Sequence, residues 1–318
     1  MDRFRSRRLA GFFFICVAVL GACKKDDSQG GGGGGGGAAS SAKDLDMIPV
    51  ESDAVIGVDL ASARQSKVVS ENVLPMLTKS GSVQQVTELL KTKCNIDPIA
   101  AISSLTAGIK MQGRKGEVVA VVHGVEKGKA LPCIDKLKEE LAAQQLTATR
   151  DGDTVEIKND RGSLAFTFIN DTTAVLVTGP QDVKARALEA AQGKSALKSS
   201  KEFNDMLGRV KTGHTLWFLI RGDAEGLAKA LEQVNVKAKA IYGSLNATDG
   251  LELDAKVRTE TEEQATNLAA LMKSQGEMAA AMMEKVDISS DKSDVKIQVA
   301  LTAAQLKTLL PLAMRGMR

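Results

Sequence analysis

The sequence predicts an α+β fold with helices packed on one face of antiparallel sheet, and three observations lead to this class. Residues 251–257 and 295–301 alternate apolar and polar side chains, which is typical of strands with one buried and one wet face. Short turns rich in Gly, Asn and Asp separate consecutive strands, as expected for antiparallel neighbours. Segments with apolar residues at helical spacing lie between the strand groups and would cover the apolar face.

The first half is expected over residues 45–200. A β-branched, apolar run predicts a strand over residues 53–60, and helices are expected over 68–77 and 83–93. Residues 105–111 and 117–125 form a predicted hairpin around 113–116. A helix over 131–145 has Ile134, Leu137 and Leu141 on one side. Three strands follow. The first runs from 147–150 and continues through 154–158, and the second and third are 163–169 and 174–178. A helix over 181–191 closes this half.

The second half, residues 201–318, repeats that order loosely. It is expected to contain a strand over 215–220, a helix over 224–234, and a hairpin of 240–247 and 251–257 around Asp249 and Gly250. A long helix over 260–285, strands over 286–289 and 295–301, and a helix over 303–314 complete it. The shared order indicates a diverged tandem duplication, built as one bilobal unit or as two domains.

The first 22 residues have the character of an export leader. Four arginines at positions 3, 5, 7 and 8 precede an apolar run over residues 9–20. Twelve helical residues span about 18 Å, which is too short for a bilayer core of roughly 30 Å. Leu20, Gly21, Ala22 and Cys23 follow, and together these elements resemble the leader and lipobox of a bacterial lipoprotein precursor.

That resemblance implies a diacylglycerol thioether on Cys23, cleavage after Ala22, and a fatty acid such as palmitate on the new amine. It places the protein in the cell envelope, and Lys24 after the lipidated cysteine favours the outer membrane over the inner one. Residues 23–44 include eight consecutive glycines and are expected to form a disordered tether of about 25 Å. The alternative is an ordinary secretory leader with an incidental cysteine.

Composition limits the partners of the mature chain. Without residues 1–22 the chain retains 38 basic and 38 acidic residues, so attraction to nucleic acid is not expected. Six aromatic residues remain, mostly within apolar strand patterns, which disfavours stacking platforms for bases or sugars. The expected contacts are the membrane, through the lipid anchor, and an envelope protein or an apolar ligand.

Two cysteines remain after the leader and the lipobox are set aside. Cys94 and Cys133 are expected to pair, because the predicted compartment is oxidising. The bond would stabilise the fold by roughly 4 kcal/mol in the chain-entropy model. The alternative is two separate buried thiols.

The sequence contains little that indicates catalysis, a metal or a cofactor, and none of these is expected. Gly193, Lys194 and Ser195 resemble the end of a phosphate-binding loop, but Leu188 stands where that motif needs glycine. The two histidines, His123 and His214, are expected at strand ends or on the surface. The adjacent acids at 139–140 and 262–263 point in different directions on their helices, so neither pair is expected to share a proton.

Methionines are mildly enriched on the long predicted helix and near the C-terminus. Core packing is the favoured interpretation, ahead of an apolar groove and of a copper site. The members of this set are Met272, Met278, Met282, Met283, Met314 and Met317.

Residues 48–60 resemble the start of certain bacterial envelope proteins of unknown function, which implies an exported α+β domain. The function expected from the sequence is therefore that of a non-enzymatic envelope lipoprotein, acting as an interaction or scaffold module. A carrier of lipid or another apolar ligand is the alternative. An enzyme of unfamiliar type would require a polar cleft that brings a histidine beside carboxylates.

Overall fold

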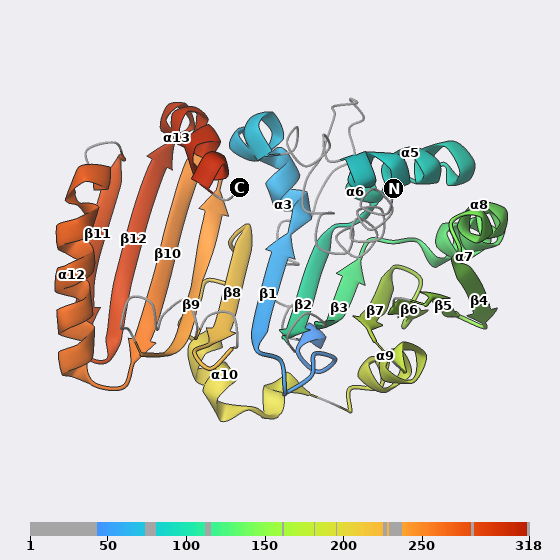
Figure 1. The fold of residues 1–318 in the computed structure, drawn as a ribbon, viewed down its shortest axis with the longest axis horizontal. Coiled ribbons are helices and arrows are strands. Elements are labelled where there is room, and N and C mark those ends of the chain that lie inside the picture. Colours follow the sequence, from blue (N-terminus) through green and yellow to red (C-terminus); the bar gives the residue numbers. More distant parts are fainter. Residues whose placement is uncertain are drawn as a thin grey trace.

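One antiparallel sheet organises the molecule. The computed structural model describes residues 43–73, 81–111, 116–160, 162–180, 182–194, 196–224, 228, 237–280 and 283–316. Within them, twelve strands lie in the order β11-β12-β10-β9-β8-β1-β2-β3-β7-β6-β5-β4 (Figure 1). The strands are β1 (Ala54–Asp59), β2 (Ser104–Lys110), β3 (Glu117–His123), β4 (Thr147–Asp151), β5 (Thr154–Asn159), β6 (Gly162–Phe168), β7 (Thr173–Gly179), β8 (Leu216–Arg221), β9 (Ala238–Ala247), β10 (Gly250–Thr259), β11 (Lys285–Asp291) and β12 (Asp294–Thr302). The predicted α+β class with antiparallel sheet is confirmed.

Helices occupy the connections between strands. None of those in the described ranges is long and apolar enough to cross a membrane. The helical elements are α3 (Leu60–Gln65), η1 (Val69–Val73), α5 (Gly81–Cys94), α6 (Pro98–Ala101), α7 (Lys127–Lys136), α8 (Lys138–Ala143), α9 (Val183–Ala191), η2 (Leu197–Ser199), α10 (Lys201–Leu207), α12 (Glu262–Ala280) and α13 (Ala303–Gly316).

The two halves of the chain have the same strand order, counted outward from the centre of the sheet. β1 and β8 are antiparallel neighbours there. One half continues as β1-β2-β3-β7-β6, and the other as β8-β9-β10-β12-β11. In both halves, three strands lie side by side in the order of the sequence. The two strands beyond them are arranged so that the later one in the sequence (β7 or β12) lies next to the third strand. The hairpin of β4 and β5 extends the first half at its outer edge, and a single sheet carries both halves.

Alternate residues of each strand define two faces of this sheet. Face A carries Val55, Gly57 and Val121, and face B carries Ile56, in register with Ala107 and Phe218. The central strands are apolar on both faces, as the unbroken run at residues 118–122 of β3 illustrates. Helices consequently pack on both faces of the sheet, whereas the sequence led us to expect helices on one face only.

Face A holds the largest core cluster. α9, α10 and the segment at residues 45–48 pack onto the central strands there. Trp217, 1% exposed, lies over Gly57, where a Cβ atom would collide with the indole ring. Glycine at this position is therefore what allows the largest side chain of the core to lie flat against the sheet.

Face B is covered mainly at its two ends. α12 packs over β10, β11 and β12, while α7 packs over β5, β6 and β7 (Figure 1). α3, α6 and η1 pack near the end of β9. Face B therefore carries the amphipathic helices that the sequence predicted over residues 131–145 and 260–285.

Several predicted elements differ in detail. The helix expected over residues 131–145 is interrupted at Leu137 (φ −92°, ψ 0°), and Leu137 and Leu141 pack in one cluster with Cys133. α10 was not predicted, although Ser200 caps it by accepting a hydrogen bond from the Phe203 amide. Of the helix expected over 68–77, residues 68–73 are described and include η1. The helix expected over 224–234 lies outside the described residues except at Ala224 and Ala228.

Candidate functional site

The described chain begins with a segment that is fixed to face A. Asp44, which the sequence assigns to the tether, is 2% exposed and accepts a hydrogen bond from the Thr106 hydroxyl at 2.7 Å. Its other oxygen lies 2.8 Å from His123 Nε2, and His123 Nδ1 lies 3.2 Å from the Thr173 hydroxyl. The folded body therefore begins earlier than expected, because Asp44 belongs to it. Cys23 and residues 24–42 lie outside the described residues.

This cluster brings a histidine beside a carboxylate, as the enzyme alternative required. Both ring nitrogens of His123 already have partners within the fold, and Thr173 is 5% exposed. An Asp–His–hydroxyl row can activate its hydroxyl as a nucleophile, but a substrate would then have to reach the hydroxyl of Thr173, which is buried. The arrangement is suited to holding residue 44 against β2 and β3.

Cys94 and Cys133 form a disulfide, as the sequence predicts, with their Cα atoms 5.2 Å apart. The bond joins the end of α5 to α7 on the first half. Cys133 is 3% exposed and packs with Leu137 and Leu141, so the bond also closes a small apolar cluster.

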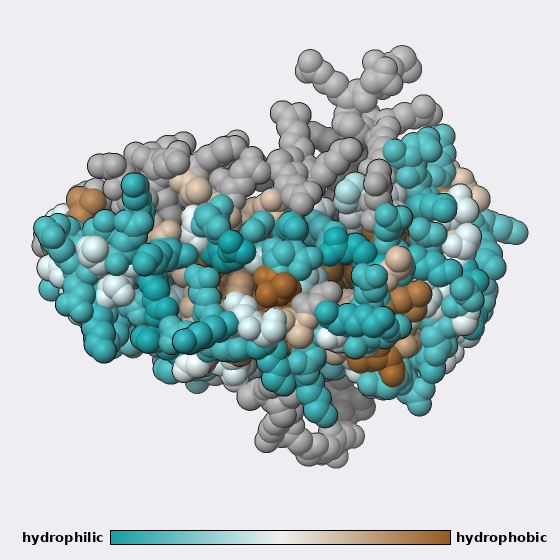
Figure 2. Space-filling view, turned by 90° about the horizontal axis from the view of Figure 1, so that it is seen from below, coloured by the Kyte–Doolittle hydropathy of each residue, from teal (hydrophilic) through white to brown (hydrophobic). Residues whose placement is uncertain are grey.

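Between its covered ends, face B carries apolar side chains that are only half-buried. Phe218 of β8, Ile56 of β1 and Ile109 of β2 belong to this central band, with Val118 and Leu176 beyond them. One row across the sheet is apolar from β11 to β5: Ile288, Ile297, Ala255, Gly243, Phe218, Ile56, Ala107, Ala120, Leu176, Phe166 and Val155. Seen from below, the surface is mostly hydrophilic with small apolar patches toward its middle (Figure 2).

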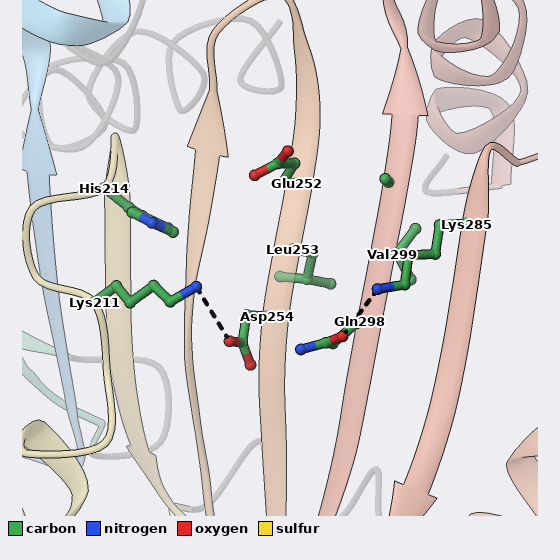
Figure 3. Close-up of a pocket in the computed structure, with 9 residues that line it drawn as sticks. Lys211, His214, Glu252, Leu253, Asp254, Lys285, Gln298 and Val299 are labelled. Atoms are coloured by element: carbon green, nitrogen blue, oxygen red, sulfur yellow. Dashed lines mark hydrogen bonds and ion pairs between the residues drawn. The ribbon is translucent and has the colours of Figure 1, made fainter.

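Face A is different over β10, β12 and β11, where it is polar and hollowed. A pocket of about 220 Å³ lies there, and Figure 3 shows its lining. Register places Glu252, Ala300 and Lys285 in one row across the three strands. Ala300 is small, so it forms a floor between an acidic wall and a basic wall. Lys211 and His214, which precede β8, close the side next to Glu252.

The charges of this pocket are only partly neutralised within the fold. Asp254 has two cationic neighbours, Lys211 Nζ at 3.9 Å and Lys256 Nζ at 3.6 Å. Among the described residues, the one hydrogen-bonding partner of Lys285 Nζ is a neutral amide, Gln298 Oε1 at 3.3 Å (Figure 3). Glu252 has neither a hydrogen bond nor an ion pair within the described part of the chain. Counting partners among the described residues alone, the pocket thus contains one unpaired carboxylate, Glu252, and one ammonium without a counter-charge, Lys285.

His214 adds a neutral ring to this lining. The pocket therefore brings a histidine beside the carboxylates of Glu252 and Asp254, which is the arrangement that the enzyme alternative required. Its Nδ1 atom is buried without a hydrogen-bond partner. Burial, and next the nearby Lys211, lower the pKa of His214 from its usual value of 6.5. The ring is therefore uncharged at neutral pH and contributes a polar edge.

A buried polar network lies on the same face beside the pocket. Tyr242 donates a hydrogen bond to Asp294 Oδ2 at 2.7 Å, and Arg258 donates to both oxygens of Asp294. Burial alone would raise the pKa of Asp294, but hydrogen bonds from Arg258 and Tyr242 outweigh it, and the pKa lies below 3.8. Arg258 also reaches Asp205 of α10 at 2.7 Å, so the network ties that helix to the sheet.

The other residues that the sequence singled out, where the structure describes them, have roles in the packing or pairing of the fold. Glu140 pairs with Lys93 at 2.6 Å, and Gly193 (φ +69°) follows the end of α9. Met272 packs in the cluster between α12 and face B. The described residues contain no group of three or more His, Cys, Asp or Glu side chains arranged to hold a metal ion. The side chains of Met278, Met282, Met314 and Met317 lie outside the described set.

Comparison with known proteins gives a likeness of fold. The structures of crystal forms I and III of TP0453 each superpose with a TM-score of 0.53, at 8% and 9% sequence identity. They cover 84% of this chain, and 95% and 96% of theirs. Crystal form IV gives a TM-score of 0.52. No protein-family model and no curated protein sequence matches the chain. At this identity the comparison establishes shared architecture, and the site must be argued from its own residues.

Proposed function

We propose that this protein is a membrane-tethered lipoprotein of the bacterial envelope, located at the outer membrane, and that its folded body is a non-enzymatic binding module. The observation that carries this proposal is the order of elements along the chain. A leader and lipobox ending at Cys23 are followed by a glycine-rich tether. The body then begins at a residue that is locked onto the sheet, because Asp44 is buried against Thr106 and His123.

This order has a mechanical meaning. A lipidated cysteine separated from the body by about 20 residues that are rich in glycine would hold the body near a bilayer without fixing its orientation. The bonds of Asp44 make the junction between tether and body a defined point on face A. The pocket on face A and the half-buried band on face B then remain available to partners at the membrane surface.

Palmitate labelling of cells tests the anchor. Wild-type protein should incorporate labelled palmitate, and Cys23→Ser should not, since the thiol is the first acceptor. Cys16→Ser, which removes a leader cysteine instead, is the matched control and should label like the wild type. Labelling of Cys23→Ser at the wild-type level would contradict the proposal.

A second function, carriage of an apolar ligand, is favoured by the half-buried apolar band of face B. Ligand sites are mostly apolar and concave, and burying an acyl chain there would remove apolar surface from water on both partners. Native mass spectrometry of the membrane-extracted protein should then show co-bound lipid. Ile56→Thr in the band should lower the lipid-bound fraction, whereas Val50→Thr, an exposed position outside it, should not. Lipid-free wild-type protein would exclude this function.

A further inference from the structure

We propose that the pocket over β10, β12 and β11 binds a small zwitterion, a molecule with one primary ammonium and one carboxylate, such as a free amino acid or a dipeptide. The proposal rests on the polar pocket of face A and is independent of both the lipid anchor and the apolar band on face B.

The lining excludes ions of a single sign. Glu252 and Asp254 would repel a phosphate or a lone carboxylate, and Lys211 and Lys285 would repel a metal ion or an amine without an acid. His214 is neutral and favours neither sign. A ligand with zero net charge and two separated charges is the class that this mixture accommodates.

The unpaired charges set the orientation of that ligand. Glu252 and Lys285 flank Ala300 on neighbouring strands, and they do not pair with each other. Strands lie about 4.8 Å apart, so the two backbones are separated by about 10 Å, with a small side chain between them. A zwitterion over Ala300 can place its ammonium at Glu252 and its carboxylate at Lys285, giving each a charged partner.

The size of the pocket agrees with a ligand of this kind. A volume of about 220 Å³ corresponds to roughly seven water molecules, enough for an amino acid or a dipeptide but below the usual range for larger ligands. Gln298 and the ring of His214 can then contribute neutral hydrogen bonds around the charged ends.

Calorimetric titration of the purified full-length chain tests this assignment with four probes: L-alanine, L-alanyl-L-alanine, N-acetyl-L-alanine and L-alaninamide. We expect at least one of the first two to bind, with a dissociation constant of about 1 mM or tighter. N-acetyl-L-alanine lacks the ammonium and L-alaninamide lacks the carboxylate, so each should bind at least about tenfold more weakly.

Variants at the two walls locate the binding. Glu252→Gln should weaken the zwitterion at least about tenfold, and so should Lys285→Gln, without lowering the melting temperature, because both side chains are exposed. Asp287→Asn, an exposed acid on β11 outside the pocket, is the control and should bind like the wild type. Ala300→Leu fills the floor and should abolish binding.

Four results would overturn the proposal. The first is no saturable binding of L-alanine or its dipeptide by the folded wild-type chain at roughly 10 mM. The second is equal binding of the acetylated or amidated probe. The third is unchanged binding by Glu252→Gln and Ala300→Leu. Preferential binding of phosphate or of a divalent metal over both zwitterions would also contradict it.

Discussion

β3 and β10 occupy equivalent places in the two halves of the sheet, yet the side chains at the middle of their face A differ in polarity. On face A, β3 is polar only at its ends, Glu117 and His123. β3 presents Val119 and Val121, which are 1% and 0% exposed beneath α9 and its neighbours. β10 presents Glu252, Asp254, Lys256 and Arg258 at its face A positions. The same strand order therefore supports a closed core in one half and an open, charged surface in the other. The difference shows that side-chain character, and not topology, decides where this fold can hold a polar ligand.

The largest effect on the free energy of unfolding is expected from exchanging an apolar and a charged side chain between these two strands. Val121→Asp would bury a carboxylate without a partner and should lower the free energy of unfolding by at least about 4 kcal/mol. The matched change Asp254→Val removes only weak, partly exposed ion pairs and should shift it by less than about 1 kcal/mol. Urea denaturation of both variants measures the contrast. Similar losses at the two positions would show that the halves are closed to the same degree.

Removal of the disulfide in the first half should give the second-largest loss of stability. Cys94 and Cys133 are 39 residues apart, and the chain-entropy model assigns such a bond about 4 kcal/mol. The double variant Cys94→Ala/Cys133→Ala should lose about this amount in a urea titration. Reductant should destabilise the wild type and leave the double variant unaffected. If reductant did not change the stability of the wild type, the disulfide would not stabilise the first half.

The second half relies instead on its charged network, and Tyr242→Phe tests it. Loss of the hydroxyl between Asp294 and Arg258 should cost about 1.5–3 kcal/mol at neutral pH. The lowered pKa of Asp294 contributes stability that is fully present above pH 3.8 and is lost as the pH falls through the folded-state value. The difference between wild type and variant should therefore shrink in acid.

Thr167→Val provides the control for that variant in the first half. It removes a hydrogen bond between the neutral hydroxyls of Thr154 and Thr167, which are 2.9 Å apart. The expected cost is about 1 kcal/mol and should not change with pH. A pH-dependent effect of Thr167→Val, or a pH-independent effect of Tyr242→Phe, would contradict the assignment of the acid sensitivity to Asp294.

The smallest effect concerns His214 in the pocket. Its folded-state pKa lies below 6.5, so the unfolded chain binds the proton more readily, and His214 lowers stability progressively as the pH falls below 6.5. His214→Gln should therefore melt closer to its neutral-pH temperature at pH 5.5 than the wild type does, by about 2 °C or less. An NMR titration that places the His214 pKa above 6.5 would contradict the burial argument.

Much of the fold follows from the sequence because its signals are local. The alternation in β10 predicted a strand with one wet face, and the unbroken run Val118–Val122 carries the opposite signal of a strand buried on both faces. The cysteine pairing was predictable because only Cys94 and Cys133 remained. The break at Leu137 was not predicted, because Cys133, Leu137 and Leu141 keep helical spacing across it.

The candidate site was not predictable in the same way, since it depends on register between distant segments. Lys285 was expected at the end of a helix, whereas it begins β11 and faces Ala300 across the sheet. Asp44 and His123 are 79 residues apart in sequence, and no local pattern links them. Glu252 was one polar residue of an alternating strand until the neighbouring strands placed it on a pocket wall.

Mass spectrometry of the N-terminal peptide, released from protein purified from membranes, shows most directly whether the folded body carries a lipid anchor. We expect a mature chain that begins at Cys23 and carries a diacylglyceryl group and an amide-linked fatty acid. A chain that carries an unmodified Cys23, or that retains residues 1–22 in the cytosolic fraction, would contradict it.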